Sequence, residues 1–295
     1  MDLPIETHEK EARGPDAPPP FILRRPLTHS VPLVLSSAHS GRHYPASFLA
    51  ESRLDPLTLR RSEDGFVEEL FAGAPEHGIP LLSATFPRVY CDANREPWEL
   101  DPGMFDEKLP EWVNSASPRV GAGLGTIARI VASGEAVYGH RLSFEDAAAR
   151  VRELWQPYHD ALGGLIQETV RRFGACLLVD CHSMPALPGD RQRADMILGD
   201  AHGTAAAPRA TRLIEESLTG LGYKVRRNDP YAGGYVTRHY GRPRDRVHVV
   251  QLEIARALYM DERRIERLPI MAALRDDLDR MMAGWSREDW SFLDA

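Results

Sequence analysis

The stretch Cys176-Leu177-Leu178-Val179-Asp180-Cys181-His182-Ser183 decides the fold class of this 295-residue chain. An apolar run of this length that ends in small polar residues is typical of a buried β-strand. Two further runs have the same character, Val31-Pro32-Leu33-Val34-Leu35-Ser36-Ser37-Ala38-His39-Ser40-Gly41 and Val247-His248-Val249-Val250-Gln251-Leu252-Glu253. Open α/β sheets place their ligands outside the carboxyl ends of the strands. The polar side chains that end these runs are therefore candidate site residues.

Helical patterns separate the predicted strands. Ser143 is a candidate N-cap for a helix whose apolar face continues to Ile166, and Pro157 is expected to kink that helix. A last helix is expected around Ile270 to Trp285. Alternating strands and helices predict an α/β fold, a three-layer α/β/α arrangement around a mixed, mainly parallel sheet. We expect one domain over residues 26–290, preceded by a disordered or loosely packed tail over residues 1–25 that is polar and rich in proline.

Composition excludes several classes of function. The net charge of −7 disfavours non-specific nucleic-acid binding, and an anionic substrate would require arginines gathered locally. Three irregularly spaced cysteines do not form a disulfide framework and are expected to be buried thiols in a reducing compartment. No segment approaches the roughly 20 apolar residues of a membrane helix, and the first twenty residues lack the apolar core of a signal peptide. We expect a cytoplasmic protein with no nucleic-acid or membrane partner.

His39 and His182 are the most informative pair of polar residues, because each follows a predicted strand. Asp180 precedes His182 by two positions, so both side chains point to the same side of the strand. A carboxylate placed there can fix the tautomer of a metal-binding imidazole. The alternative for His182 is a buried Asp–His hydrogen bond without a metal. For a lone histidine such as His39, a structural role is the more common one.

Acidic residues could complete a metal site. A catalytic zinc takes three protein ligands from His and carboxylate side chains and keeps one open position. Glu63 or Asp64 could supply the third ligand, although acids are also common in the first turn of any helix. Glu253 ends a run that is expected to be buried on both faces, where a carboxylate is unfavourable unless it is paired or functional. It is either the partner of an arginine or a general base.

Two segments could bind an anionic substrate. The segment 87–96 contains Arg88, Asn94 and Arg95, and Arg238 follows a Gly/Pro loop over residues 228–234. The arginine side chain offers a planar fork that suits a carboxylate. Surface ion pairs are the alternative for any single one of these arginines.

Taken in this order, the pieces resemble the N-formylglutamate amidohydrolase family, which belongs with the zinc carboxypeptidase and aspartoacylase type of fold. The matching segments lie between residues 32 and 262. They are His39-Ser40-Gly41 with Pro45, Glu63-Asp64, Arg88 and Asp92-Ala93-Asn94-Arg95, Tyr158-His159, Asp180-Cys181-His182-Ser183-Met184-Pro185, Pro230-Tyr231-Ala232-Gly233-Gly234-Tyr235-Val236-Thr237-Arg238, and Gln251-Leu252-Glu253 with Leu258-Tyr259-Met260.

The resemblance implies an amidohydrolase that uses Zn²⁺, or another divalent metal, to release formate from a small N-formyl amino acid such as N-formylglutamate. His39, Asp64 and His182 match the metal ligands, with Glu63 as the fallback for the acid. Glu253 matches the base that activates water. Arg95 is expected at the developing oxyanion. The expected substrate-binding residues are Arg88, Asn94, Arg238, Tyr231, Gly233 and Gly234.

Two departures from the family pattern leave the substrate open. Ala38 stands where a proline often precedes the family's histidine, and Glu63-Asp64-Gly65-Phe66 replaces an Asp-Thr-Asp-Trp-His stretch. One alternative is hydrolysis of another N-acyl amino acid or small peptide-like amide. The other is a catalytically silent protein that binds an acidic metabolite.

Overall fold

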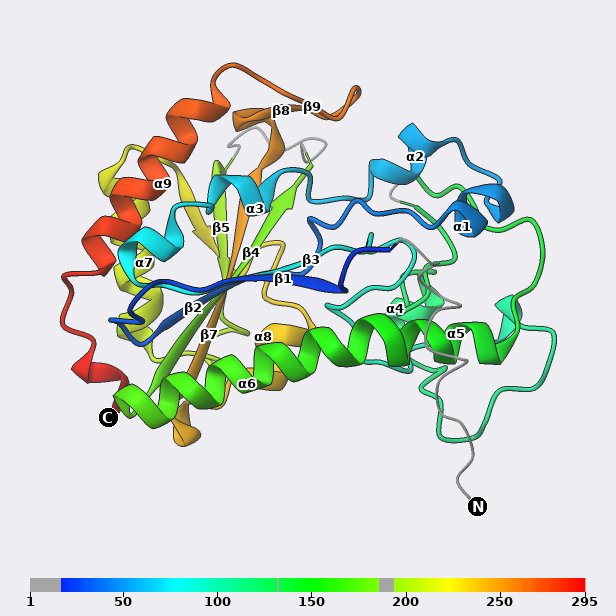
Figure 1. The fold of residues 1–295 in the computed structure, drawn as a ribbon, viewed down its shortest axis with the longest axis horizontal. Coiled ribbons are helices and arrows are strands. Elements are labelled where there is room, and N and C mark those ends of the chain that lie inside the picture. Colours follow the sequence, from blue (N-terminus) through cyan, green and yellow to red (C-terminus); the bar gives the residue numbers. More distant parts are fainter. Residues whose placement is uncertain (1–16, 132, 186–193, 295) are drawn as a thin grey trace. The chain divides into compact units, whose positions relative to one another are not determined.

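A seven-stranded sheet is the main element of the computed structural model, which describes residues 17–131, 133–185 and 194–294 (Figure 1). The strand order is β1-β3-β2-β4-β7-β5-β6. The strands are β1 Phe21–Arg24, β2 Leu33–Ser37, β3 Leu81–Ala84, β4 Cys176–Met184, β5 Met196–Gly199, β6 Val225–Arg227 and β7 Val247–Ala255. Strand β2 is parallel to β3 and β4, β4 to β7, and β5 to β6, whereas β5 is antiparallel to β7. The predicted α/β class with a mixed, mainly parallel sheet is confirmed.

The described residues also form α-helices. They are α1 Ala46–Glu51, α2 Pro56–Arg60, α3 Val67–Leu70, α4 Pro118–Gly121, α5 Phe144–Arg150, α6 Gln156–Phe173, α7 Pro208–Gly220, α8 Tyr235–Tyr240 and α9 Met271–Trp285. A short hairpin of β8 Met260–Asp261 and β9 Glu266–Arg267 precedes α9. The similarity of this fold to the zinc carboxypeptidases stays a prediction.

Alternation along the central strands separates an apolar face from a polar one. Leu177, Val179 and Cys181 of β4 belong to a core cluster that also contains Val250, Leu252 and Ile254 of β7. The same cluster includes residues of α3, α7 and α9, which therefore cover this face. Because successive side chains of a strand point to opposite faces, the intervening polar residues lie on the other face. Asp180 and His182 of β4 and Gln251 and Glu253 of β7 are thereby placed on one side of the sheet.

Local signals predicted the start of α5 and the position of an irregular segment before α6. The Ser143 side chain accepts a hydrogen bond from the Asp146 backbone N–H at 3.1 Å, so the predicted N-cap of α5 is confirmed. A π-helical segment over Val151–Trp155 joins α5 to α6 just before Pro157. Proline has no N–H to donate to the carbonyl four residues earlier, so the change of pitch occurs where the kink was expected.

The chain divides into two compact units. Among the described residues, the first contains 17–22, 41–63 and 84–160, and the second contains 23–40, 64–83 and 161–294. This division into compact units does not test the expectation of one domain over residues 26–290, which stays a prediction. Strand β1 lies inside the predicted tail, most of which falls outside the described residues. Within the described ranges, the structure contains no helix with the length and apolar character needed to cross a membrane.

Candidate metal centre

Three buried side chains of the second unit form a group that could hold a metal ion. His39, Asp64 and His182 each offer one ligand atom, and these atoms all lie within 4.8 Å of one another. The Asp64 Oδ2 atom lies 2.9 Å from His182 Nδ1 and 3.4 Å from His39 Nδ1. The two imidazole rings meet edge to face, with their centroids 4.7 Å apart. Two imidazole nitrogens and one carboxylate are a donor set typical of catalytic zinc.

Three elements bring these residues together. His182 lies on β4, His39 follows β2, and Asp64 lies in the turn before α3. The Asp64 backbone N–H donates a hydrogen bond to the His39 carbonyl at 3.0 Å, which joins the last two segments directly. Phe66 then adopts a left-handed conformation with φ of 67° and starts α3 at Val67. Glu63 and Asp64 therefore precede the helix rather than form its first turn, which corrects the sequence-based interpretation.

Asp180 orients His182 as the sequence predicts. The Asp180 Oδ2 atom lies 2.8 Å from His182 Nε2, and the Ser36 hydroxyl donates to the other carboxylate oxygen at 2.7 Å. A proton on Nε2 satisfies Asp180 and leaves the Nδ1 lone pair facing the group. The carboxylate, imidazole and candidate metal position thus form the arrangement that supports metal ligands in proteins.

The electrostatics of the group favour positive charge. Burial alone raises the pKa of Asp64, but hydrogen bonds with His182 and His39 outweigh it and hold this pKa well below its ordinary value. Burial lowers the pKa of His182, but Asp180 and Asp64 outweigh it and raise this pKa well above its ordinary value. Two carboxylates therefore stabilise positive charge at the position that a divalent cation would take.

Arg256 belongs to the site but was not among the residues predicted from the sequence. Its Nη2 atom donates to Asp64 Oδ1 at 3.1 Å, and its Nε atom donates to the Ser183 hydroxyl at 3.2 Å. The side chain is buried. Arg256 lies between two segments that carry the family resemblance, Gln251 to Glu253 and Leu258 to Met260. The location of Arg256 between these two segments could have marked it as a candidate site residue, but no local pattern indicated that it contacts Asp64.

Glu63, the fallback ligand, has other partners in the first unit. Arg60 contacts its two carboxylate oxygens at 3.1 and 3.3 Å, and the Tyr44 hydroxyl donates to it at 2.8 Å. Burial raises the pKa of Glu63, while Arg60 and Tyr44 oppose that shift. Asp64, and not Glu63, belongs to the group with the two histidines.

Glu253 lies on β7, which pairs with β4, the strand that carries His182. It pairs in register with His182 of β4, and register partners in parallel strands share a face of the sheet. The Gln251 side chain donates to Glu253 Oε1 at 2.7 Å and accepts a hydrogen bond from the Gly234 backbone N–H at 2.8 Å. Glu253 is thus buried on the polar face and connected to the glycine loop through Gln251.

The predicted substrate loop of the second unit is tightly packed. Gly233 has φ of 113°, and a Cβ atom there would come within 2.8 Å of Thr237 Cβ, so this position requires glycine. Tyr231 is partly buried and Gly234 is buried. Arg238 is exposed on α8. Solvent therefore reaches the Arg238 guanidinium.

The remaining predicted residues lie close together in the first unit. Arg88 Nη2 lies 2.8 Å from Asp92 Oδ2, and Arg95 Nη2 lies 3.8 Å from the same oxygen. Arg95 also donates to the carbonyls of Leu124 and Asn94, both at 2.8 Å. Burial lowers the pKa of Arg95 to about 10, which leaves it charged at neutral pH. Two guanidinium groups therefore lie near one carboxylate.

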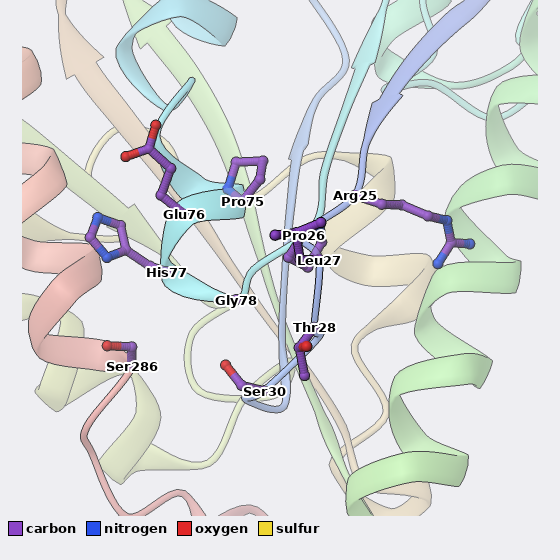
Figure 2. Close-up of a pocket in the computed structure, with 10 residues that line it drawn as sticks. All are labelled: Arg25, Pro26, Leu27, Thr28, Ser30, Pro75, Glu76, His77, Gly78 and Ser286. Atoms are coloured by element: carbon purple, nitrogen blue, oxygen red, sulfur yellow. The ribbon is translucent and has the colours of Figure 1, made fainter.

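One pocket of the second unit is lined by residues other than those of the candidate site. It has a volume of about 500 Å³, and its lining includes Leu27, Ser30 and Gly78 (Figure 2). Figure 2 shows the Arg25 side chain directed away from His77. Arg25 pairs with Glu168 at 2.9 Å, and His77 pairs with Asp279 at 2.8 Å. The ten described residues around this pocket include none of the predicted site residues.

The fold and the site define an α/β protein with a buried candidate metal centre on the polar face of its sheet. The model of the N-formylglutamate amidohydrolase family matches residues 31–260. The chain belongs to this family.

Named relatives extend this similarity over most of the chain. The N-formylglutamate deformylase of Pseudomonas aeruginosa is 29% identical over 272 residues, which are 88% of this chain and 96% of the relative. A protein of the same name from Pseudomonas putida is 28% identical over 238 residues, covering 79% of this chain and 83% of the relative. The crystal structure of N-formylglutamate amidohydrolase from Ralstonia eutropha JMP134 is similar to this fold, with a TM-score of 0.85 and 36% identity. That similarity covers 90% of this chain and 97% of the other.

Proposed function

We propose that this chain is a metal-dependent amidohydrolase that converts an N-formyl amino acid, N-formylglutamate or a close analogue, to formate and the free amino acid. The observation that carries the proposal is the buried group of His39, Asp64 and His182, which lies in a chain of this family. Relatives named N-formylglutamate deformylase support the substrate class.

The donor set favours zinc or a similar divalent ion over magnesium or calcium. Mg²⁺ and Ca²⁺ prefer oxygen ligands, whereas imidazole nitrogens suit Zn²⁺ and the later transition metals. His39 and His182 supply nitrogen and Asp64 supplies one oxygen, so the residues fit such an ion. A bound divalent ion supplies Lewis acidity that polarises a carbonyl and favours ionisation of water.

Glu253 is the proposed general base. Its carboxylate takes a proton from water as the water oxygen forms a bond to the formyl carbon. The C–N bond then breaks, and the same proton passes to the departing amine. The formic acid that forms keeps the oxygen from water and ionises to formate, and its proton passes to the free amine or to solvent. Arg95 is the proposed donor to the oxygen on which negative charge develops.

The arginines are proposed to recognise the substrate carboxylates. An N-formyl dicarboxylic amino acid carries two negative charges, and the chain's net charge of −7 opposes its approach. Arg88 is proposed to bind one carboxylate, because its planar guanidinium suits a carboxylate. Arg238, Asn94 and the loop of Tyr231, Gly233 and Gly234 are proposed as further substrate contacts.

Metal reconstitution and formate release together test this function. The protein is stripped with a chelator and then assayed on N-formylglutamate, N-formylglutamine and N-acetylglutamate after addition of Zn²⁺, Co²⁺, Mn²⁺ or Mg²⁺. We expect formate release that depends on the metal and is fastest with N-formylglutamate. Acetate release as the fastest reaction would favour the other N-acyl amino acids. Metal-dependent binding without turnover of any of them would favour the silent binding protein.

A further inference from the structure

The two carboxylate oxygens of Asp64 have different partners, and Arg256 is the partner of one of them. Oδ2 faces the histidines, 2.9 Å from His182 Nδ1, whereas Oδ1 accepts a hydrogen bond from Arg256 Nη2 at 3.1 Å. Both side chains are buried, so water does not compete freely for either oxygen. An aspartate with two free oxygens could turn both of them toward a cation. The guanidinium holds one of them away from the histidines.

The same guanidinium also contacts the strand that carries His182. Arg256 Nε donates to the Ser183 hydroxyl at 3.2 Å, and Ser183 is the next residue after His182. The planar guanidinium donates in two fixed directions, so these contacts set the position of Asp64 relative to the end of β4. A lysine ammonium keeps the charge but does not reproduce this fork.

The β8–β9 hairpin that follows Arg256 covers the turn that carries Asp64. A methyl group built on Gly65 would contact Met260 and Ile265 at 3.6 to 3.8 Å. Arg267 of β9 contacts both carboxylate oxygens of Glu69, at 2.6 and 2.7 Å. The hairpin therefore packs against the backbone of this turn, while Arg256 contacts the Asp64 carboxylate directly.

We propose that Arg256 is a positioning residue that makes Asp64 a one-oxygen metal ligand, an inference that rests on the metal-dependent function proposed above. Its contribution has two opposing parts. The guanidinium orients the ligand oxygen, which strengthens metal binding, and its positive charge repels a cation. Because hydrogen bonding to Asp64 Oδ1 neutralises much of that charge locally, we infer that orientation dominates. Loss of an outer partner of a metal ligand weakens metal binding by about 10- to 100-fold.

Chelator competition on the metal-free protein tests this inference. Zinc affinity is measured for the wild type, Arg256→Met, Arg256→Lys and the control Arg264→Met, which removes an exposed hairpin arginine that pairs with Glu266. We expect zinc affinity about 10- to 100-fold weaker in Arg256→Met, an intermediate value in Arg256→Lys and no change beyond twofold in Arg264→Met. In the Co²⁺-loaded protein, only the Arg256 variants should show a changed visible spectrum, because Asp64 can then offer both oxygens.

The outcomes distinguish failure of this inference from failure of the proposed function. One equivalent of zinc bound by the wild type, with equal or tighter binding in Arg256→Met, overturns the role of Arg256 and leaves the metal centre intact. Wild-type protein that binds no metal overturns both. If Arg256→Met does not fold, Arg256→Lys decides, and wild-type affinity and spectrum in that variant overturn the inference. Lower thermal stability with unchanged zinc affinity in either variant would show a structural role only.

Discussion

Gln251 donates a hydrogen bond from Nε2 to Glu253 Oε1 at 2.7 Å, and the orientation of its amide is set by Gly234. The Gly234 backbone N–H can only donate, so it must face the amide oxygen of Gln251. The amide nitrogen is then directed at Glu253, where it stabilises the ionised carboxylate. The glycine loop thereby acts on the proposed base through one side chain.

Replacing Gln251 should impair the proposed base without removing it. In Gln251→Glu, an ionised carboxylate faces Glu253 in place of a donor, so proton transfer needs a higher pH. We expect kcat/KM at neutral pH to fall by about 10-fold or more, with the acidic limb of the pH–rate profile moved upward. Gln251→Met is the uncharged control and should move that limb less. An unchanged profile in both variants would exclude this coupling.

Glu253 itself should act on turnover and not on metal binding. Glu253→Gln keeps the shape of the side chain but does not take up a proton. We expect zinc content to be retained and kcat to fall by about 100-fold or more, the usual scale for loss of a general base. Single-turnover assays with metal analysis on the same sample check this. Near-normal kcat would assign the base to another group.

The arginines should differ in what they recognise. Arg238 is exposed, so its contact with a side-chain carboxylate is screened by solvent and is worth about 1 kcal/mol or less. Arg238→Ala should therefore lower kcat/KM by roughly fivefold for N-formylglutamate and less for N-formylglutamine. An equal loss of kcat/KM for both substrates would show that Arg238 does not contact the side-chain carboxylate of the substrate.

Arg95 should show the opposite pattern. Because Arg95 is buried and is proposed to contact the reacting carbonyl, Arg95→Ala should impair both substrates alike, by about 2 to 5 kcal/mol. Thermal unfolding of the variant controls for loss of its contacts to Leu124 and Asn94. Loss confined to N-formylglutamate would assign Arg95 to the side-chain carboxylate.

His248 should contribute to the loss of stability at acidic pH. Burial lowers its pKa, against opposing effects of the Leu293 carbonyl and Asp294, and its Nδ1 accepts a hydrogen bond from the Ala207 N–H at 3.1 Å. Above a pH of about 6.5, both the folded and the unfolded states carry a neutral His248, so pH has no effect through this group. Below that pH the unfolded state binds the proton first, and stability falls by at most about 1.4 kcal/mol per pH unit until the folded-state pKa is reached.

Urea unfolding at pH 7.5 and pH 5 measures this contribution. His248→Gln does not titrate and can still donate to Leu293, so its free energy of unfolding should fall less between the two pH values than that of the wild type. Parallel losses in both proteins would show that His248 does not carry the effect.

The strands and their polar ends could be predicted because the signals are local. The run 176–183 contains both the strand and the Asp180–His182 spacing, and the structure places both side chains on the polar face. The partners of these residues depend on tertiary packing. Arg256 meets Asp64 across 192 positions of the chain, and no local pattern encodes that contact. Gln251 could be assigned to a predicted strand and to a segment of the family resemblance, but not to a role, because that role depends on which backbone group faces its amide.

The turn at Asp64 could not be predicted for a different reason. Phe66, Leu70 and Ala74 repeat at four residues, as in a helix, yet α3 ends at Leu70 and a 3₁₀-helix covers Ala74–His77. Gly73 and Pro75 interrupt the pattern, and the left-handed Phe66 delays the start of α3. The hairpin that packs on this turn is distant in sequence, so the position of Asp64 follows from the tertiary structure.

Metal content tests the central claim most directly. Wild-type protein, His182→Ala and the control Glu63→Gln are purified in parallel, saturated with Zn²⁺, passed through a desalting column and analysed by inductively coupled plasma mass spectrometry. We predict one zinc per chain in the wild type and in Glu63→Gln, and loss of stoichiometric zinc in His182→Ala, because only two protein ligands remain. A full equivalent of zinc in His182→Ala, or no zinc in the wild type, would contradict the account.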